Sequence, residues 1–560
     1  MAAGEFLAAH DAALSALAAG EDGTALRQTA VLALARAGAL GSARRLFARL
    51  GLGADPDPEI RGLGARLLKD RALAHGRRGD ARAAACASLA LFRDTNDAWH
   101  GINAAAMLLL AGRARMASRL AADVAALPDR GDYWSAATRA EAALLVGDTQ
   151  GVARALEIAE ARAGDDLAAR ATTLRQMRWE LERLGLDAAV LAPLRMPAVV
   201  HFCGRIPGGP ADEGPLRAAL RPLVDGAGHG FGGLAAGADI VIAEALLAVG
   251  ARVTAILPFP PPDYIAASVA PAGESWVARF HAVLPRCEVV VVNSQRIDDC
   301  EFALASRRAM GRARLAASAL AAPCWQIAVM EGEPTPGLAG TAADVAAWQA
   351  AGGRSHVLPN PWPRRQAVAA LPTAREMKSV LFADLRGFGA LDDAALACFY
   401  AAVLPRFAAA LAIGTPVYRN AWGDALQAVF DFPPLAAAAG AAVACAVPMA
   451  DLAASGLPTT LRPRVALDFG ALAPVFDAVQ GVGKFAGTVM TRAARIEPVT
   501  PPGSVYATEA FACEMALAPA ADFACDYAGV VATAKSFGHL PLYALRPLAR
   551  PETTVEGDEP

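Results

Sequence analysis

Aromatic residues are scarce in this 560-residue chain. They make up 6% of the sequence, whereas hydrophobic residues as a group reach 55% because alanine is so abundant. Small side chains of this kind favour helices and give cores of alanine, leucine and valine. The chain is also far longer than one hydrophobic core usually grows. We therefore predict a helix-rich protein of mixed α and β structure, divided into several domains.

An excess of charge of either sign is also missing. The 52 basic and 55 acidic residues leave a net charge of -3, so no whole-chain field would gather nucleic acid or anionic lipid. The N-terminus has early acidic residues and lacks the basic start and apolar run of a secretory signal. The uncharged stretch 432–450 is too rich in alanine and proline to insert in a membrane. We expect a cytoplasmic protein with no nucleic-acid or membrane partner.

Cysteine motifs are absent too. The nine cysteines are scattered, with no C-x-x-C pair and no cysteine–histidine cluster at zinc spacing, which is typical of reduced thiols. His201, Cys203 and His229 lie near a glycine-rich segment but have no partners at a spacing that suits nucleophilic or metal chemistry. We expect them in the core or in loops.

Residues 1–192 show amphipathic helices and no strand-like alternation. Trp99 and Trp134 lie 35 residues apart, close to the 34-residue period of tetratricopeptide repeats (TPR). The pattern predicts TPR-like helix pairs that stack into a groove for a protein partner, with a plain helical bundle as the alternative. Glycines at similar intervals are predicted to end helices: Gly41, Gly79, Gly112 and Gly147.

Residues 196–365 change to alternating strands and helices. Apolar strands are predicted over 198–206, 251–259 and 287–294, with a helix over 238–250. This series favours a Rossmann-like domain with a parallel sheet. The proline-rich segment 359–377 is the predicted linker to the next domain.

The segment 228–239, GHGFGGLAAGAD, reads as a glycine-rich loop before a helix, an arrangement that suits a phosphate group or simply tight packing. It resembles the nucleotide-sensing Rossmann-like domains of the SLOG type. The resemblance implies a nucleotide-like effector whose site is lined by Gly230, Gly232, Gly233, Gly237 and Asp239.

Two carboxylates stand out in the last third of the chain. The apolar strand in KSVLFADLRGFGAL is predicted to end at Asp384, and PVYRNAWGDALQAVF places Asp424 in a β-hairpin turn. Each motif alone is common, but two carboxylates so placed can share divalent metals.

The order of motifs resembles the class III nucleotidyl cyclases. Residues 487–511, GTVMTRAARIEPVTPPGSVYATEAF, are similar to the helix motif of that family and place Arg495 at the position of its transition-state arginine. Lys535, in AKSFGHLPLYAL, stands where the family has a triphosphate-binding lysine. The resemblance implies an α+β domain with a ferredoxin-like core over 376–548. Residues 549–560, after it, are predicted to be a disordered tail.

The resemblance also implies a mechanism. Asp384 and Asp424 would hold two Mg²⁺ or Mn²⁺ ions, while Arg495 and Lys535 would stabilise charge on the phosphates of a nucleoside triphosphate. The family builds its site from two chains, so a head-to-tail homodimer is expected. The phosphate cradle is expected in the loop after the first strand: Leu385, Gly387, Phe388 and Gly389.

Three positions depart from the family pattern. Thr491 replaces the asparagine that orients the ribose, and Asn420 and Lys484 occupy the base-reading positions without matching either the adenine or the guanine pattern. The nucleotide that is cyclised is therefore left open. Three arginine side chains lie near these motifs in the sequence, and each is expected either to be a solvated surface charge or to contact the nucleotide: Arg386, Arg419 and Arg492.

Three functions remain open on the sequence. The preferred hypothesis is a signalling enzyme that converts a nucleoside triphosphate to a 3′,5′-cyclic nucleotide and pyrophosphate under the control of its N-terminal domains. The departures at the nucleotide-contacting positions favour instead a catalytically silent, nucleotide-binding scaffold. In the third, the middle domain is a nucleotide hydrolase or glycosidase, and the last domain regulates it.

Overall fold

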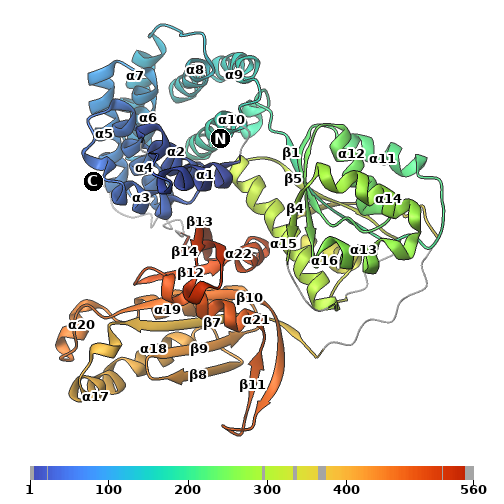
Figure 1. Ribbon diagram of the computed structural model, residues 1–560. Coiled ribbons are helices and arrows are strands. Elements are labelled where there is room, and N and C mark those ends of the chain that lie inside the picture. The colour runs from blue at the N-terminus through green and yellow to red at the C-terminus, as the bar shows by residue number, and fades with distance from the viewer. Residues whose placement is uncertain are drawn as a thin grey trace.

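The computed structural model describes residues 5–21, 23–292, 297–331, 337–363, 374–519 and 521–548. An N-terminal set of helices, a central parallel sheet and a C-terminal, mostly antiparallel sheet follow one another along the chain (Figure 1). Most of the predicted linker and the predicted tail, 549–560, lie outside the described residues.

The N-terminal region is helical, as predicted, and its helices pack in consecutive pairs. Trp99 and Trp134 are each the second residue of a helix, α6 and α8, so they occupy equivalent places in successive repeats. Two ion pairs at 3.1 Å fasten the segment before α8: Arg130 pairs with Asp97, the N-cap of α6, and Asp129 pairs with Arg162 of α9. The helices are α1 Phe6–Ala18, α2 Thr24–Arg36, α3 Leu40–Arg49, α4 Pro58–His75, α5 Arg78–Thr95, α6 Ala98–Leu110, α7 Ala114–Ala125, α8 Tyr133–Val146, α9 Thr149–Ala163 and α10 Leu167–Leu184.

Two of the predicted helix-ending glycines are placed differently by the structure. Gly41 lies inside α3 and Gly79 in the first turn of α5. The preceding helices end instead near Gly38 and Gly76, whose φ angles of +83° and +67° are left-handed and suit a residue without a Cβ. Two predicted glycines do follow helix ends: Gly112 and Gly147.

The central sheet has the order β4-β3-β2-β1-β5-β6, and every pair in it is parallel, as predicted. Helices α12 and α15 both pack on β1, β2 and β3, so they cover opposite faces. The elements are β1 Ala198–Gly204, α11 Gly214–Val224, β2 Ala227–Gly232, α12 Ala238–Ala248, β3 Arg252–Leu257, α13 Pro261–Ser268, α14 Glu274–Val283, β4 Glu288–Val291, α15 Asp299–Leu320, β5 Cys324–Val329, α16 Thr341–Ala350 and β6 Arg354–Leu358.

The glycine-rich segment 228–239 is not one loop, contrary to the prediction. Gly230 and Gly232 belong to strand β2, where a Cβ would lie 2.6 Å from the Leu246 side chain and 2.5 Å from the Phe202 carbonyl oxygen. Their absent side chains therefore allow close packing inside the sheet. Only the residues from Gly233 to Gly237 form the connection to α12.

The C-terminal sheet has the order β13-β14-β12-β10-β7-β9-β8, with β11 paired to β10. Strands β10, β7, β9 and β8 are antiparallel neighbours and give the arrangement of a ferredoxin-like βαββαβ unit. The elements are β7 Glu376–Arg386, α17 Asp393–Ala402, α18 Leu404–Ala412, β8 Tyr418–Trp422, β9 Ala425–Phe430, α19 Pro433–Cys445, α20 Met449–Ala454, β10 Arg462–Asp477, β11 Val482–Ala486, α21 Thr488–Ile496, β12 Ser504–Thr508, α22 Glu509–Leu517, β13 Phe523–Ala532 and β14 His539–Pro547.

The two faces of this sheet carry different helices. Leu381, Ala383 and Leu385 alternate toward the core that the sheet forms with α17, α18, α19 and α22. Val380 lies on the other face, in a cluster with Val489 of α21. Asp384 has the same parity in β7 as Val380, so its side chain belongs to the α21 face.

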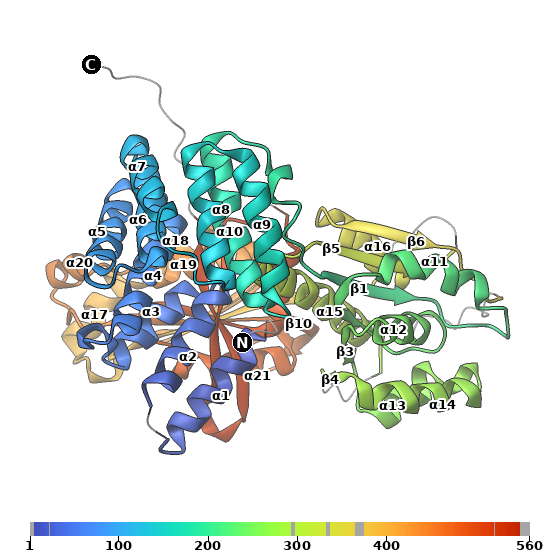
Figure 2. The ribbon, with the colours of Figure 1, turned by 90° about the horizontal axis from the view of Figure 1, so that it is seen from above.

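Helix α15 lies where the three parts of the chain meet (Figures 1 and 2). It packs on the central sheet, on α22 of the C-terminal domain and on α10 of the repeats. The repeats also contact the edge of the C-terminal sheet directly, because α1 and α3 pack on β13, and Tyr527 donates a hydrogen bond to Asp11 at 2.6 Å.

One helical stretch of the described chain, Asp393–Ala412, is long and apolar enough to cross a membrane by length and composition. The structure divides it between α17 and α18, and 28% of it is buried. One such helix is weak evidence, since core helices pass the same test.

Candidate functional site

Asp384 and Asp424 come together at one end of the C-terminal sheet. Asp424 lies in the β8–β9 turn after Gly423, which has a φ of +61°, as the sequence predicts. Asp384 precedes the end of β7 by two residues, because the strand continues to Arg386 instead of ending at Asp384. The N–H of Leu385 donates to both carboxylates, at 2.8 Å to Asp384 and 3.1 Å to Asp424.

Two further charged residues, which the sequence analysis missed, complete this cluster. Arg464 of β10 is the direct cross-strand partner of Asp384 and donates from Nη2 to its Oδ2 at 2.9 Å. Arg464 also forms an ion pair with Glu497, just after α21, at 2.8 Å. The guanidinium of Arg464 therefore bridges Asp384 and Glu497, and Asp424 joins the cluster through the N–H of Leu385.

Burial and the charge of Asp384 raise the pKa values of Asp424 and Glu497 above that of Asp384. Burial opposes ionisation of Asp384, but its hydrogen bonds with Asp424, Leu385 and Arg464 outweigh that effect and lower its pKa. The pKa of Asp424 is raised to about 7 by burial and by the neighbouring Asp384. Burial also raises the pKa of Glu497 to about 7, with a contribution from the charge of Asp384. Concentrated negative charge of this kind suits a cation.

The predicted phosphate loop follows β7 directly. Gly387 has a φ of +95°, which allows the chain to turn into the short helix 388–390. Phe388 packs edge-on against Phe399 with ring centroids 4.8 Å apart, and the Leu385 side chain is buried in the core. Side chains therefore anchor the loop. Gly389 is exposed, and a Cβ there would meet no atom within 4 Å.

The other predicted catalytic residues face away from the carboxylates. Val489, Met490, Ala493 and Ile496 bury one side of α21. Thr491 and Arg495, one helical turn apart, lie on the outer side, where Thr491 is exposed and Arg495 half-buried. Lys535 is exposed in the β13–β14 turn, which packs near α21. Among the described residues, none of the three bonds to Asp384 or Asp424.

The residues that depart from the cyclase pattern have local partners. Lys484 pairs with Asp477 at 2.6 Å, and this pairing raises its pKa. The side-chain oxygen of Asn420 accepts a hydrogen bond from the N–H of Ala421 at 3.0 Å.

The arginines near the motifs differ in burial and in their partners. Arg492 donates to the fully buried Asp468 at 2.6 and 2.9 Å, so it fastens α21 to β10. Asp468 also accepts a hydrogen bond from Thr508 at 2.6 Å. Arg386 and Arg419 are exposed.

A second candidate site is a cavity of about 600 Å³ in the central domain. Gly233 and Asp239 line it, whereas Gly230 and Gly232 lie in β2 and Gly237 caps α12. His201, in the wall, stacks on Trp348 and bonds to Gln326 at 3.1 Å. Burial raises the pKa of Cys203, so its thiol is a poor nucleophile.

His229 lies in strand β2, and burial lowers its pKa. In the described part of the chain, no three histidine, cysteine or acidic side chains gather as a metal cluster.

Residues 5–108 match the family model of TPR-S, Tetratricopeptide Repeats-Sensor. This match agrees with the helical repeats of the structure. No curated protein matches the chain.

Solved structures of cyclases are similar to about a third of the chain. The adenylyl cyclase CyaB from P. aeruginosa is 17% identical, with 32% of this chain and 98% of that chain covered and a TM-score of 0.28. The guanylate cyclase domain of RhGC from Catenaria anguillulae, in complex with GTP, is 14% identical, with 31% of this chain and 97% of that chain covered and a TM-score of 0.27. A structure of adenylate cyclases from Trypanosoma brucei is 18% identical, with 32% of this chain and 92% of that chain covered and a TM-score of 0.27. At these scores, no functional conclusion rests on the likenesses.

Proposed function

We propose that residues 376–548 convert a nucleoside triphosphate to a 3′,5′-cyclic nucleotide and pyrophosphate, at sites shared between two copies of the chain. The observation that carries the proposal is the pair Asp384 and Asp424, held side by side by one N–H group, beside the glycine-containing loop 387–389. Carboxylate oxygens are the donors that Mg²⁺ and Mn²⁺ prefer, and such ions commonly bind through one or two carboxylates plus substrate phosphates. The donor set therefore fits the expected ions.

When bound, divalent ions would supply charge neutralisation of the triphosphate and a lower pKa for the ribose 3′-hydroxyl. In the reaction, the ribose 3′-hydroxyl loses its proton to water and its oxygen bonds to the α-phosphorus, the bond from that phosphorus to the bridging oxygen breaks, and pyrophosphate leaves. Arg495 and Lys535 would donate N–H groups to the charge that builds on the phosphates. Loss of one such donor typically lowers the rate by about 10²- to 10³-fold.

The position of Arg495 supports a second copy of the chain in the proposed site. Arg495 lies on the outer side of α21, whose inner side is buried against the sheet that carries Asp384. One chain therefore presents the carboxylates and the arginine on different surfaces. A two-fold dimer can place the arginine of one copy opposite the carboxylates of the other.

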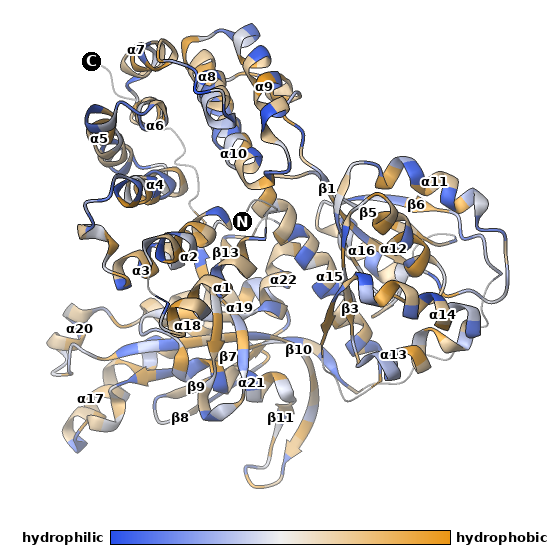
Figure 3. Cartoon of the chain, turned by 45° about the horizontal axis from the view of Figure 1, so that its top comes forward, coloured by the Kyte–Doolittle hydropathy of each residue, from blue (hydrophilic) through white to orange (hydrophobic). Residues whose placement is uncertain are grey.

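Exposed apolar side chains near the carboxylate pair and in the β10–β11 hairpin support the proposed dimer. Trp422, beside Asp424, is 88% exposed, and Phe476 and Val479 in the β10–β11 hairpin are 70% and 96% exposed. The hairpin extends from the body of the domain (Figures 1 and 3). Large apolar groups at such exposure are typical of interaction surfaces.

A silent nucleotide-binding scaffold is the second candidate function, and two contacts favour it. Arg464 already neutralises Asp384, and Lys484 is engaged by Asp477. In this alternative the ion pairs persist, and nucleotide binds without turnover.

The deciding experiment is incubation of the full chain with ATP, GTP, CTP and UTP separately, with Mn²⁺, followed by mass analysis of the products. We expect a cyclic product from at least one triphosphate, absent from Asp384→Asn and retained by the control Asp393→Asn, an exposed residue of α17. No product, with nucleotide binding intact, would support the scaffold. Free base or monophosphate would point to the middle domain as the enzyme.

A further inference from the structure

Three arginines from distant helices converge inside the helical repeats. Arg36 is the last residue of α2, Arg66 lies in α4 and Arg175 lies in α10. Nη1 of Arg175 donates to the carbonyl oxygen of Arg36 at 2.9 Å, although 139 residues separate the two in the sequence. The helical region therefore curves back on itself, and Figure 1 shows α2 and α10 beside each other.

Arg36 has no counter-charge in contact with its side chain. The residue is half-buried, its Nε is buried without a hydrogen-bond acceptor, and within the described residues its guanidinium forms no ion pair. Burial, together with the charge of Arg66, lowers the pKa of Arg36 to about 10, and the charge of Asp166 acts against this. An unpaired buried cation is costly, so an anion brought by a ligand would stabilise it.

Arg66 and Arg175 also have little negative charge beside them. Nε of Arg66 lies 3.6 Å from Oδ2 of Asp70, which is longer than a hydrogen bond, and this Nε is buried without an acceptor in the described chain. Burial lowers the pKa of Arg175 to about 10, and the charges of Arg66 and Arg36 act in the same direction, against that of Asp70. The three guanidinium groups therefore lie close enough to repel one another.

Lys69 of α4 does not share this excess of positive charge. Its side chain is buried, and its Nζ donates to Oδ1 of Asn103 at 2.6 Å. Burial lowers the pKa of Lys69, but the charges of nearby acids raise it: Asp70, Glu141 and Glu180. Lys69 thus has a hydrogen-bond partner and counter-charges, whereas the uncompensated charge belongs to the three arginines.

Phosphate groups suit this arrangement of cations. A guanidinium presents a planar fork of N–H donors that matches the oxygens of a phosphate, and several such forks can bind one multiply charged anion. The side chains of Arg66 and Asp70 are 10% and 22% exposed, so solvent reaches the cluster but a folded protein does not. The chemistry therefore favours a small molecule with at least two negative charges.

We infer that the interior of the repeats binds a small phosphate-bearing anion between Arg36, Arg66 and Arg175. The anion would supply the negative charge that these side chains lack, and it would hold α2, α4 and α10 together. The folded chain should then be more stable with the anion than without it. Binding there does not require the C-terminal domain to be active.

Arg175 also connects this site to α15. Its Nη1 donates to the carbonyl oxygen of Ala319 at 2.9 Å, close to the end of that helix. Nearer the middle of α15, Arg308 and Arg312 donate from Nε to Glu509 of α22 at 2.6 and 2.9 Å. An anion that engages Arg175 would therefore act on the helix that contacts the C-terminal domain.

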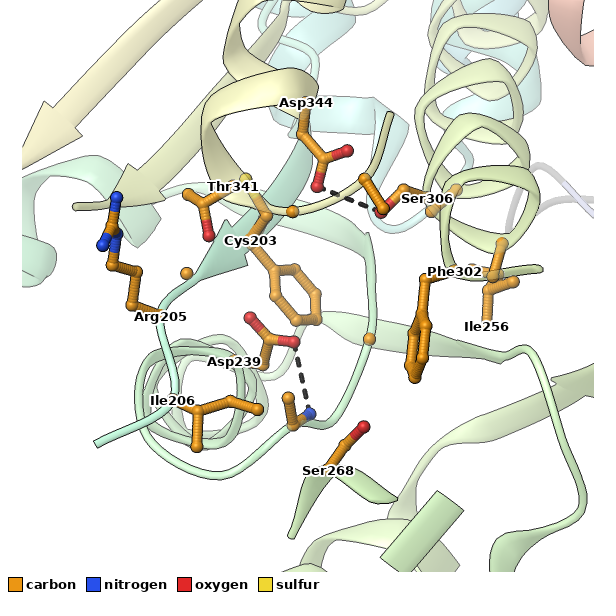
Figure 4. Close-up of a pocket in the computed structure, with 18 of the residues that line it drawn as sticks. Cys203, Arg205, Ile206, Asp239, Ile256, Ser268, Phe302, Ser306, Thr341 and Asp344 are labelled. Atoms are coloured by element: carbon orange, nitrogen blue, oxygen red, sulfur yellow. Dashed lines mark hydrogen bonds between the residues drawn. The ribbon is translucent and has the colours of Figure 1, made fainter. Parts of the chain in front are cut away.

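The cavity of the central domain offers an anion a different environment. Figure 4 shows the buried acids Asp239 and Asp344 pointing into this cavity from α12 and α16, with Arg205 at one side. An anion bound there would depend on Arg205 and not on the arginines of the repeats. Substitution of Arg205 therefore distinguishes the two places.

Binding is tested by calorimetric titration of the full chain with inorganic phosphate, pyrophosphate and tripolyphosphate. EDTA is present, so that divalent ions do not bring phosphate to the carboxylate pair of the C-terminal domain. We expect at least one of these anions to bind, and Arg36→Gln and Arg175→Gln each to weaken it at least tenfold. Two controls should bind as the wild type does: Arg82→Gln, which changes an exposed arginine of α5, and Arg205→Gln.

Melting curves distinguish a ligand site from a structural role. Without phosphates, Arg36→Gln should melt no lower than the wild type, because the substitution removes a cation that has no counter-charge in contact. With saturating ligand the wild type should melt higher, and Arg36→Gln should gain less. A lower melting temperature of Arg36→Gln without phosphates would assign the arginine a structural role instead.

Four results of the titrations would overturn the inference. They are failure of all three anions to bind the wild type, unchanged affinity of both Arg36→Gln and Arg175→Gln, loss of binding in Arg205→Gln, and tighter binding of a polyglutamate peptide than of any phosphate. The third would place the anion in the central cavity, and the fourth would assign the arginines to an acidic protein partner.

Discussion

Arg464 and Asp384 are direct cross-strand neighbours in β10 and β7, and Nη2 of Arg464 lies 2.9 Å from Oδ2 of Asp384. The side chain of Arg464 is 20% exposed, so solvent still reaches this pair. A triphosphate held at Asp384 and Asp424 through cations would meet a guanidinium at the same place. The contact therefore serves either to lock the carboxylate or to receive the phosphates, and substitution distinguishes the two roles.

Arg464→Gln is expected to weaken nucleoside triphosphate binding. Hydrogen bonds to charged groups contribute about 1.5–3 kcal/mol, which corresponds to a loss of roughly tenfold or more in affinity. The measurement is calorimetric titration with each triphosphate in Mn²⁺. Arg406→Gln, which removes an exposed arginine of α18, is the control. Tighter metal and nucleotide binding by Arg464→Gln would mean that the arginine locks the site.

The dimer proposal makes a separate prediction about Trp422 and Val479. Replacing either by serine removes an exposed apolar group, so we expect monomers to predominate in sedimentation at concentrations where the wild type is dimeric. The fold of one chain should be unaffected, because neither side chain is buried. Phe432→Ser is the matched control, since Phe432 is 64% exposed beyond the other end of β9. A dimer that survives both substitutions would place the interface elsewhere.

The parts of the site that come from local sequence could be predicted, and those that come from strand register could not. Asp424 follows from a Gly-Asp turn between apolar strands, and its placement in a hairpin agrees with the prediction. Arg464 is eighty residues from Asp384, and only the pairing of β10 with β7 brings them together. Glu497 reaches the cluster through its ion pair with Arg464.

The glycines of the central domain also show that contacts between residues far apart in the sequence could not be predicted. A run of glycines before a helix reads as a loop, but Gly230 and Gly232 lie in a strand because Leu246 and Phe202 pack where side chains would be. That close packing is a tertiary contact and has no signal in the local sequence. The buried Asp239 was identified from its position at the start of α12, whereas Asp344 was not, because nothing in the sequence links α16 to α12.

Glu509 is expected to matter most for the joint between α15 and α22. Its side chain is 8% exposed and faces both Arg308 and Arg312. Removing one partner of a buried ion pair costs about 3–5 kcal/mol, so Glu509→Gln should lower the melting temperature clearly. Glu514→Gln should have a smaller effect, because burial raises the pKa of Glu514 to about 6 and its partner Arg307 is 36% exposed. Equal melting temperatures for the two variants would contradict this ranking.

Asp344 should make the central domain less stable as the pH rises. Burial raises the pKa of Asp344 to about 7, although Ser306 and the charge of Arg307 lower it, whereas an unfolded aspartate has a pKa of about 3.9. Between these values the folded state holds the proton more tightly. Stability therefore falls from about pH 4 to about pH 7 and is constant above that range with respect to this group.

Asp344→Asn removes this penalty and retains an acceptor for Ser306. Its stability relative to wild type should be greater at pH 8 than at pH 5 by about 3 kcal/mol, because about two pH units of the range over which stability falls lie above pH 5. Urea denaturation at the two pH values, without nucleotide, measures the difference. Asp239 has a pKa of about 7 as well, so the variant should retain part of the pH dependence. Asp263→Asn should not alter it, because that side chain is exposed. A gain that is the same at both pH values would show that Asp344 is ionised throughout the range.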